Sequence, residues 1–168
     1  MAWQIPIITE GQHKYSRIKY IYKKRILKFL NTGVVPVIAG FQGINKDLKI
    51  TTIGRGGTDA SAIMFAKFFR ADRCVIYTDV EGVFTTDPNK FKKAKKIKNI
   101  SYEEMLEMAS LGSKVMQPHS IQDARLNRIN IEVKSSFLNK SGTLITKKKN
   151  IINNNCLLYT SPSPRDSS

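Results

Sequence analysis

The chain has 168 residues, of which 28 are Lys or Arg and 13 are Asp or Glu, and its formal net charge is +15. Its 41% hydrophobic and 24% charged residues are typical of a soluble globular domain, and its two cysteines, without a CxxC pair, provide neither a disulfide framework nor a metal site. Because no apolar run is long enough to cross a membrane and residues 1–6 show no signal-peptide pattern, we expect a cytoplasmic protein with no membrane partner.

The first part of the chain predicts a helix, two strands and a second helix. Apolar side chains recur at helical spacing in residues 14–30, and the Thr-Gly pair that follows is typical of a helix end. The run VVPVIA at residues 34–39 predicts a buried strand, although its proline disfavours complete pairing. Residues 40–45 predict a loop. Residues 49–53 predict a short strand that leads, from Asp59, into a helix with aromatic side chains in the core.

The middle of the chain predicts one strand and a long connection. Cys74-Val75-Ile76-Tyr77 is apolar and β-branched, which predicts a buried strand with Cys74 as a small apolar filler. Residues 79–100 show no clear periodicity. A connection of this length inside a compact domain is usually functional or mobile.

The last part predicts two helices and two strands. Ser101-Tyr102-Glu103-Glu104 has the pattern of a capping box, which begins a helix that closes at Gly112. Pro118 opens a second, short helical segment. Residues 131–135 alternate as a half-buried strand, and residues 142–146 predict the last strand.

The turn that precedes the helix at Asp59 has the composition of an anion site. Its glycines, Gly56 and Gly57, let backbone N–H groups approach an anion closely. Arg55 can hold a carboxylate with two parallel hydrogen bonds, which lysine cannot do. Asp59 is placed to cap the helix or to orient a reacting group. The turn therefore favours a small anionic substrate, although a plain strand-to-helix connection has the same composition.

A second polar loop follows the strand at residues 74–77. It reads TDVEGVFTTDP over residues 78–88. Two strand ends thus carry polar, glycine-bearing loops, with a helix between them. Because ligands bind at the carboxyl ends of strands in open α/β sheets, both loops are candidates for ligand binding.

Four segments, in their order and spacing, resemble the aspartate kinases of the amino-acid kinase superfamily. They are GRGGTD at residues 54–59, YTDVEGV at 77–83, TTDP at 85–88 and SYEEMLEMASLGSKVM at 101–116. The resemblance extends over roughly residues 3–146. It implies an α/β fold, the mostly parallel three-layer sandwich of that superfamily, of which residues 1–146 form a partial domain, the nucleotide-side half.

The resemblance implies phosphorylation of the β-carboxylate of L-aspartate by ATP, the first step toward lysine, threonine and methionine. It assigns the aspartate contacts to Arg55, Gly56, Gly57 and Thr58. It places Asp59 and Asp79 near the reacting phosphate as the catalytic acidic residues. It assigns the nucleotide contacts to Thr78, Asp79, Phe84, Asn89, Lys90, Lys114 and Val115. Mg²⁺ is expected to be held mainly through the nucleotide phosphates, without a dedicated set of protein ligands.

Two positions depart from the family pattern. Phe84 stands where the family commonly has Tyr, so a hydroxyl contact is lost. Asn89 stands where the family often has Arg, directly after Asp-Pro. Lys90 can replace that arginine as a point charge, although without bidentate geometry. Lys114 matches a nucleotide-contacting lysine of the family, but a lysine beyond a helix end is also favoured by the helix dipole alone.

Two segments that the family carries are absent from the sequence, Lys-x-Gly-Gly and Ser-Thr-Gly-Glu. Trp3 matches a point well inside the family's catalytic domain, so we interpret Met1 as an internal start. The family's regulatory ACT domains would follow Thr146, and a homo-oligomer is expected only of the complete enzyme. We therefore expect uncovered strand edges and little or no kinase activity from this chain. Residues 147–168 are interpreted as a basic, then Ser- and Pro-rich tail, which resembles translated sequencing-adaptor sequence from about residue 156.

Two alternatives stay open. Another amino-acid kinase, acting on acetylglutamate, glutamate or UMP, would carry related motifs. A basic nucleic-acid-binding module would use the lysines of residues 90–98 and 147–149. Since Phe91 is the one aromatic residue among these lysines and no nucleic-acid-binding signature occurs, we expect a solvated loop and no nucleic-acid partner.

Overall fold

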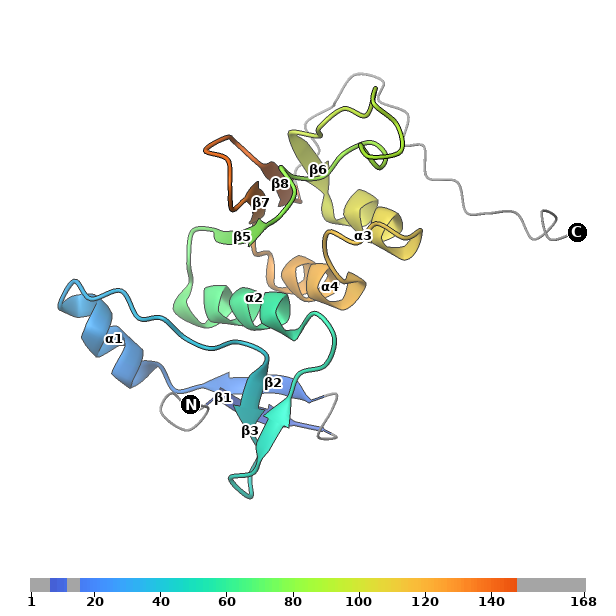
Figure 1. Cartoon of the computed structure of the whole chain (residues 1–168). Helices are drawn as coiled ribbons and strands as arrows, with labels where there is room; N and C mark the ends of the chain where they lie inside the picture. The colour runs from blue at the N-terminus through green and yellow to red at the C-terminus, as the bar shows by residue number, and fades with distance from the viewer. Residues whose placement is uncertain (1–6, 12–15, 148–168) are drawn as a thin grey trace, which may run out of the picture. The chain divides into compact units, whose positions relative to one another are not determined.

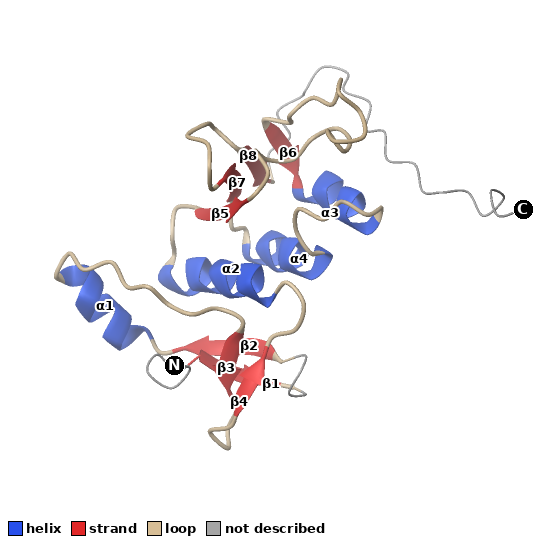
Figure 2. Cartoon of the chain, in the orientation of Figure 1, coloured by secondary structure: helices blue, strands red, loops and turns tan. Residues whose placement is uncertain are grey.

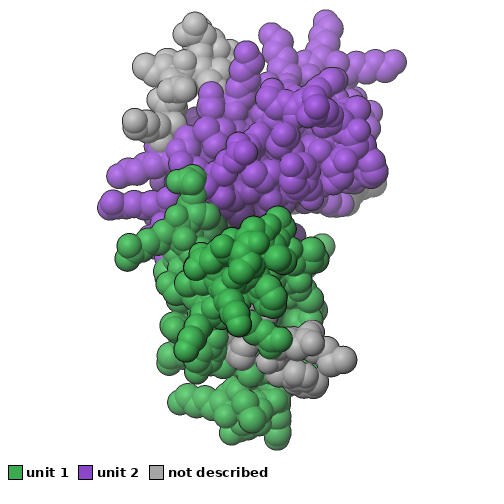
Figure 3. All heavy atoms as spheres, turned by 90° about the vertical axis from the view of Figure 1, so that its left-hand side faces the viewer, with its two compact units in different colours: residues 1–72 green, residues 73–168 purple. Residues whose placement is uncertain are grey.

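The computed structural model describes residues 7–11 and 16–147, whose helices and strands are drawn in Figure 1 and Figure 2. The chain divides into two compact units, residues 1–72 and 73–168, coloured separately in Figure 3. No helix within the described ranges is long and apolar enough to cross a membrane. The expectations for Trp3 and for the tail beyond Lys147 fall outside the described residues.

The first unit contains a four-stranded sheet in the order β2-β1-β3-β4. Its strands are β1 (Ile7–Glu10), β2 (Arg17–Ile21), β3 (Gln42–Ile44) and β4 (Ile50–Thr52). β1 pairs antiparallel with β2 and parallel with β3, and β3 pairs antiparallel with β4. The helices of the unit are α1 (Lys23–Asn31) and α2 (Gly57–Phe69). The core consists of Ile7, Ile18, Ile21 and Ile26, against which Met64, Phe65, Phe68 and Phe69 of α2 pack.

The predicted helix over residues 14–30 is wrong in its first part, where strand β2 precedes α1. The pairing of β1 with β2 contains an irregularity, at which Lys19 has no residue opposite it on β1. Such a bulge adds one residue to the strand. Because of the bulge, Ile18 and Ile21 are both buried although they are three positions apart. This spacing is the one expected of a helix. The end of the helix at Asn31 agrees with the prediction.

Residues 34–39 do not form the predicted buried strand. They belong to neither sheet of the described structure, and the side chains of Val35 and Val37 are 82% and 98% exposed. The segment leaves α1 through a backbone hydrogen bond of 3.0 Å from the Val34 N–H to the Phe29 carbonyl. A β-branched apolar run becomes a strand only where a neighbouring strand pairs with it, and sequence pattern alone does not supply that neighbour.

A strand also lies within residues 40–45, where a loop was expected, because β3 forms a hairpin with β4. The side-chain oxygen of Asn45 closes this hairpin by accepting hydrogen bonds from the N–H groups of Asp47 (3.0 Å) and Lys49 (2.9 Å). On β3, a Cβ atom at Gly43 would lie 2.6 Å from the carbonyl oxygen of Ile7 on β1. The tight approach of the two strands therefore requires glycine at that position.

The second unit contains a sheet in the order β5-β7-β8-β6 and two helices. Its strands are β5 (Cys74–Thr78), β6 (Asn99–Ser101), β7 (Ile131–Ser135) and β8 (Thr143–Thr146). β5 runs parallel to β7 and β6 runs parallel to β8, whereas β7 and β8 are antiparallel. The helices α3 (Tyr102–Ser110) and α4 (Pro118–Asn127) contact each other, and α3 also contacts β6 and β8.

Several predictions for this unit are confirmed. The Ser101 hydroxyl accepts a hydrogen bond from the Glu104 N–H (3.2 Å), and the Glu104 carboxylate accepts one from the Ser101 N–H (2.9 Å), which is the predicted capping box. Pro118 is the first residue of α4, and Cys74 is buried. The α/β class is also confirmed. The sheets are less parallel than expected, since three of the six strand pairings in the described residues are antiparallel.

Candidate functional site

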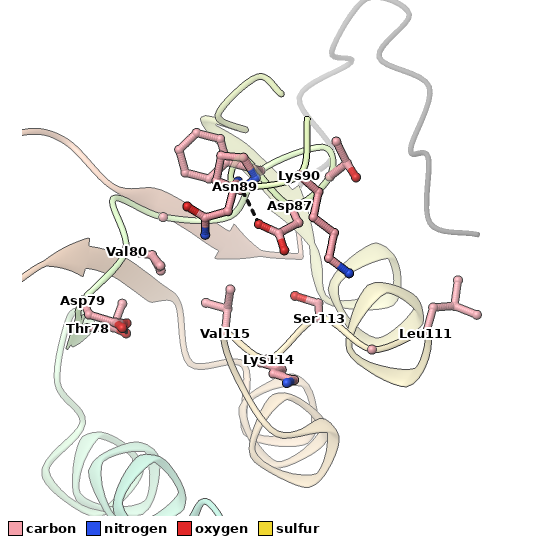
Figure 4. A pocket seen from close by; sticks show the side chains of 15 residues that line it. Thr78, Asp79, Val80, Asp87, Asn89, Lys90, Leu111, Ser113, Lys114 and Val115 are labelled. Carbon is pink, nitrogen blue, oxygen red and sulfur yellow. Dashed lines mark hydrogen bonds between the residues drawn. The ribbon is translucent and has the colours of Figure 1, made fainter. Parts of the chain in front are cut away.

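A pocket of the second unit is lined by polar loops that lie far apart in the sequence. Its volume is about 600 Å³, which is within the usual range of small-molecule sites. The lining residues come from the loop at 78–82 after β5, from residues 84–90 in the connection to β6, and from residues 111–115 after α3 (Figure 4).

The first wall of the pocket follows directly from strand β5. The Thr78 carbonyl oxygen accepts a hydrogen bond from the Ser136 N–H (2.8 Å), which fixes the end of β5 beside the end of β7. The Thr78 hydroxyl donates to a carboxylate oxygen of Asp79 (3.0 Å), and Asp79 is exposed. A hydroxyl and a carboxylate therefore stand at the carboxyl end of a parallel strand, where ligands bind in α/β sheets.

The second wall belongs to a short hairpin within the long connection over residues 79–100. Residues 83–85 and 95–97 form its stem, in which Phe84 and Lys96 make an antiparallel bridge. Backbone hydrogen bonds join Ile97 to Val83 (2.8 Å) and Thr85 to Lys95 (2.9 Å). The connection therefore has a defined structure that its lack of periodicity did not reveal.

The tip of this hairpin is ordered by Asp87. Its carboxylate accepts a hydrogen bond from the Asn89 N–H (2.9 Å), which is the dashed line in Figure 4. Its carbonyl oxygen accepts from the N–H groups of Lys90 (3.1 Å) and Phe91 (2.9 Å). The turn leaves Asn89 and Lys90 exposed, and the Lys90 side chain extends toward the segment that carries Ser113.

The third wall is the chain reversal that ends α3. Gly112 has a φ of +111°, a conformation that favours glycine, and its N–H donates to the Ala109 carbonyl (3.3 Å). The Ser113 N–H donates to the Met108 carbonyl (2.9 Å), which completes a Schellman motif. This motif buries Ser113 and leaves the next residue, Lys114, exposed at the pocket.

The pocket combines positive charge with apolar surface. Lys90 and Lys114 bring two ammonium groups from different segments, and Asp79 and Asp87 bring two carboxylates. The apolar lining comes from Val80, Phe84, Leu111 and Val115. Such a combination suits a ligand that has both anionic groups and a flat apolar part. Within the described residues, no group of three or more His, Cys, Asp or Glu side chains is placed to hold a metal ion.

All seven residues to which the sequence assigned nucleotide contacts line this one pocket: Thr78, Asp79, Phe84, Asn89, Lys90, Lys114 and Val115. Eight further residues line the pocket without a role expected from the sequence, namely Val80, Gly82, Thr86, Asp87, Pro88, Leu111, Gly112 and Ser113. The one signal in the sequence that could have indicated them is their position, because each lies within three residues of an assigned residue. The contacts themselves stay a prediction.

The residues predicted to bind the carboxylate substrate lie in the first unit, in the turn from β4 to α2. Gly54 and Gly56 have φ values of +89° and +72°, and the Gly57 N–H donates to the Gly54 carbonyl (3.0 Å). A Cβ atom at Gly57 would lie 3.0 Å from the ring of Phe41. The glycines therefore allow a reversal and a close packing that other residues would strain.

The polar residues of this turn are accessible. Arg55 and Thr58 are exposed, and Arg55 has no ion pair in the part of the chain that the structure describes. Asp59 lies in the first turn of α2, where the helix dipole favours an acidic side chain. It is not the predicted helix cap, because the N-cap position is Gly56.

Comparison with known proteins gives independent evidence on the chain. A sequence model of the amino acid kinase family matches residues 3–135. The aspartokinase of Rickettsia felis is 47% identical over 155 residues, which cover 91% of this chain and 39% of that protein. The aspartokinase of Geobacillus stearothermophilus is 46% identical over 147 residues, which cover 88% of this chain and 36% of that protein. The chain thus spans less than two fifths of the length of these curated relatives.

Among solved structures, aspartokinase III of E. coli in complex with aspartate and ADP has a similar fold, with a TM-score of 0.77. It is 34% identical in sequence, and the match covers 85% of this chain and 33% of that chain. The resemblance drawn from the four sequence motifs is therefore confirmed.

Proposed function

Because this chain belongs to the amino acid kinase family, we propose that it is the nucleotide-binding part of an aspartate kinase. The proposed reaction is the phosphorylation of the β-carboxylate of L-aspartate, in the biosynthesis of lysine, threonine and methionine. ATP supplies the phosphoryl group. The observation that carries the proposal is the pocket of the second unit, which gathers seven expected nucleotide residues from three separate segments.

The residues of the pocket fit a nucleoside triphosphate. The ammonium groups of Lys90 and Lys114 provide charge-assisted hydrogen bonds for phosphate oxygens. The ring of Phe84 and the side chain of Val115 provide apolar surface for a base, and the Thr78 hydroxyl provides a polar contact. A volume of about 600 Å³ is sufficient for such a ligand.

Two carboxylates line the pocket, and only one of them is suited to a catalytic role. Asp87 holds the hairpin tip through its contact with the Asn89 N–H, so its carboxylate has a structural task. Asp79 accepts one hydrogen bond, from Thr78, and is exposed. We therefore assign Asp79 to the reacting phosphate. Mg²⁺ would be held mainly by phosphate oxygens and water.

The turn in the first unit is proposed to bind L-aspartate. Arg55 is exposed and offers the two parallel N–H groups that match a carboxylate. The exposed Thr58 hydroxyl adds a donor at the start of α2, where the helix dipole favours an anion, and Gly56 and Gly57 let the turn approach a ligand closely. Asp59, one residue further, is assigned to organising the charges around the transferred group. A solved relative of 34% identity contains aspartate and ADP, which supports the proposal of these two ligands.

Aspartate is favoured over the other acceptors considered for this family. The curated relatives of 47% and 46% identity are both named aspartokinases, and neither is named for acetylglutamate, glutamate or UMP. The complete enzyme is proposed to act in the cytoplasm as a homo-oligomer.

Isothermal titration calorimetry of the 168-residue chain with ATP and Mg²⁺ tests the nucleotide assignment. We expect ATP to bind, and we expect Lys114→Ala to raise the ATP dissociation constant about tenfold because one charge-assisted contact is lost. Lys147→Ala, which removes an exposed lysine outside the pocket, is the matched control and should leave the constant unchanged. A wild-type chain that binds no ATP would show the proposal to be wrong.

The acceptor is tested in the same calorimeter with a non-hydrolysable ATP analogue present. L-aspartate, acetylglutamate, glutamate and UMP are titrated in turn into the wild-type chain and into Arg55→Lys. We expect aspartate to bind the wild type most tightly and the variant more weakly, because lysine lacks the bidentate geometry. Tighter binding of any of the other three compounds would replace aspartate as the proposed substrate.

A further inference from the structure

We propose that Thr143 is a positioning residue for the nucleotide pocket, although it lies 60 residues from Val83 and 46 residues from Ile97 in the loop that it holds. The inference rests on the proposed nucleotide-binding function. Thr143 is on β8 and its side chain is fully buried, so it cannot touch a ligand. Its hydroxyl instead holds the hairpin stem that carries the second wall of the pocket.

The hydroxyl of Thr143 makes contacts with both sides of the stem. It accepts a hydrogen bond from the Val83 N–H (2.8 Å) and donates one to the Ile97 carbonyl (2.6 Å). Val83 and Ile97 are themselves joined by a backbone hydrogen bond of 2.8 Å. A single buried oxygen therefore closes the base of the hairpin against the sheet.

The stem residue that Thr143 holds stands between two residues of the pocket. Val83 is fully buried, while its neighbours Gly82 and Phe84 both line the pocket. Any shift of the Val83 backbone thus moves pocket residues on both sides of it. The same stem carries the turn ordered by Asp87, and with it Lys90.

A glycine adapts the loop to this contact. Gly82 has a φ of +144°, and a Cβ atom on it would lie 2.6 Å from the Thr143 hydroxyl oxygen. The loop therefore approaches the threonine as closely as a backbone without a side chain allows. This close approach explains why glycine is needed at that point of the loop.

A second set of contacts ties the same loop from the outside. The Lys96 ammonium group donates to the Ser141 carbonyl (2.8 Å) and lies 3.6 Å from the Glu81 carboxylate, which is also 3.6 Å from Lys140. These groups are partly exposed, so their ion pairs are weak and screened by salt. The buried hydroxyl of Thr143 is not screened in this way, so we assign the main positioning role to it.

The test compares three variants of the 168-residue chain by ATP titration in the presence of Mg²⁺. Thr143→Val keeps the branched shape and removes the hydroxyl, which leaves a buried N–H and a buried carbonyl without this partner. Thr143→Ser keeps the hydroxyl. Thr146→Val is the matched control, because it removes a hydroxyl from the same strand, one that donates to the Asn130 side chain (2.8 Å) away from the hairpin.

We expect Thr143→Val to raise the ATP dissociation constant about tenfold, because the pocket-forming arrangement of the loop becomes a minor population. The other two variants are expected to remain within about twofold of the wild type, since neither loses the contact with the hairpin. NMR hydrogen exchange should show a less protected Val83 amide in Thr143→Val alone. A merely structural role would lower the melting temperature of Thr143→Val without separating its ATP affinity from the affinities of the other two variants.

The possible outcomes separate the inference from the proposed function. If the wild type binds ATP and Thr143→Val binds it equally well, the positioning role is refuted and the proposed function stands. If the wild type binds no ATP, both the proposed function and the inference are refuted. If Thr143→Val does not fold, Thr143→Cys replaces it, since a thiol is a weaker donor and acceptor; its ATP affinity must then lie below that of Thr143→Ser, and equal affinity would refute the inference.

Discussion

At the scale of single residues, the pocket shows how one position compensates for another. Asn89 occupies the position where the resemblance leads us to expect arginine, and its N–H is engaged with Asp87. The neighbouring Lys90 is exposed, lines the pocket and extends toward its third wall. The positive charge at this point therefore comes from Lys90, as a point charge rather than a planar fork.

Replacing Lys90 with alanine should weaken ATP binding. The expected rise in the dissociation constant is about fivefold to tenfold, because one charged contact to the phosphates is lost. Lys93→Ala is a suitable control, since Lys93 belongs to the same exposed loop but does not line the pocket. Calorimetric titration with ATP measures both variants, and equal affinities of the two would contradict the role of Lys90.

Tyr102 is a buried residue with a predicted effect of pH on stability. Burial of its ring, assisted by the Glu103 carboxylate, raises the pKa of its hydroxyl, which donates to the Ile129 carbonyl (2.7 Å). Because the folded state favours the neutral phenol, this contribution to stability is present below the unfolded-state pKa of about 10 and is lost as the pH rises through the higher folded-state pKa.

Urea unfolding of the wild type and of Tyr102→Phe, at pH 8 and at pH 11, measures this contribution. At pH 8 the variant should be less stable by about 1 to 3 kcal/mol, because the Ile129 carbonyl loses its buried partner. At pH 11 the difference should become smaller, since only the wild type carries the phenol that ionises on unfolding. Deprotonation of the lysines affects both proteins alike. A difference that does not change with pH would exclude a shifted Tyr102 pKa.

At the scale of elements, helix ends were more predictable than strands. The capping box before α3 and the proline at the start of α4 depend on residues that are neighbours in the sequence. β2 was mistaken for part of a helix because a bulge moved two isoleucines to helical spacing. Residues 34–39 have the composition of a strand but have no partner in either sheet. Local signals thus predicted the starts of α3 and α4, although not the cap of α2, whereas strand pairing requires knowledge of the neighbouring strand.

Ser101→Ala tests the contribution of the capping box to the stability of the second unit. The substitution removes the acceptor of the Glu104 N–H and should lower the free energy of unfolding by about 1 kcal/mol. Ser110→Ala, at the other end of α3, is the matched control, because its exposed hydroxyl donates only to a helix carbonyl, that of Leu106. Chemical unfolding of both variants should show a clear loss for Ser101→Ala alone. Equal losses would mean that the capping box adds nothing specific.

At the scale of the whole molecule, the chain holds the pocket proposed for the nucleotide but spans less than two fifths of the length of its curated relatives. Two segments expected from the resemblance, Lys-x-Gly-Gly and Ser-Thr-Gly-Glu, do not occur in its sequence. The apolar segment at 34–39 exposes Val35 and Val37 almost completely. Exposed apolar segments are sites of association, so we expect the chain to have a limited solubility.

The purified 168-residue chain should bind ATP without phosphorylating aspartate. The transfer depends on positioning several charged groups around the phosphates, and the lysine and glutamate of the two absent segments are part of that set in the resemblance. Coupled measurement of ADP release, with and without L-aspartate, checks this expectation. Aspartate-dependent ADP release well above a reaction without protein would show that the chain is active as it stands.

The sequence by itself determined the family, through its four motifs, and it indicated the starts of α3 and α4 and seven of the residues that line the pocket. These features depend on short segments, such as residues 77–90, in which the functional residues are contiguous. Only the tertiary structure showed that residues 111–113 complete the pocket, that residues 34–39 lack a strand partner, and that Thr143 holds a loop from another part of the chain. The physical reason is that strand pairing and buried hydrogen bonds join residues distant in sequence, and no local pattern specifies which distant residue will be the partner.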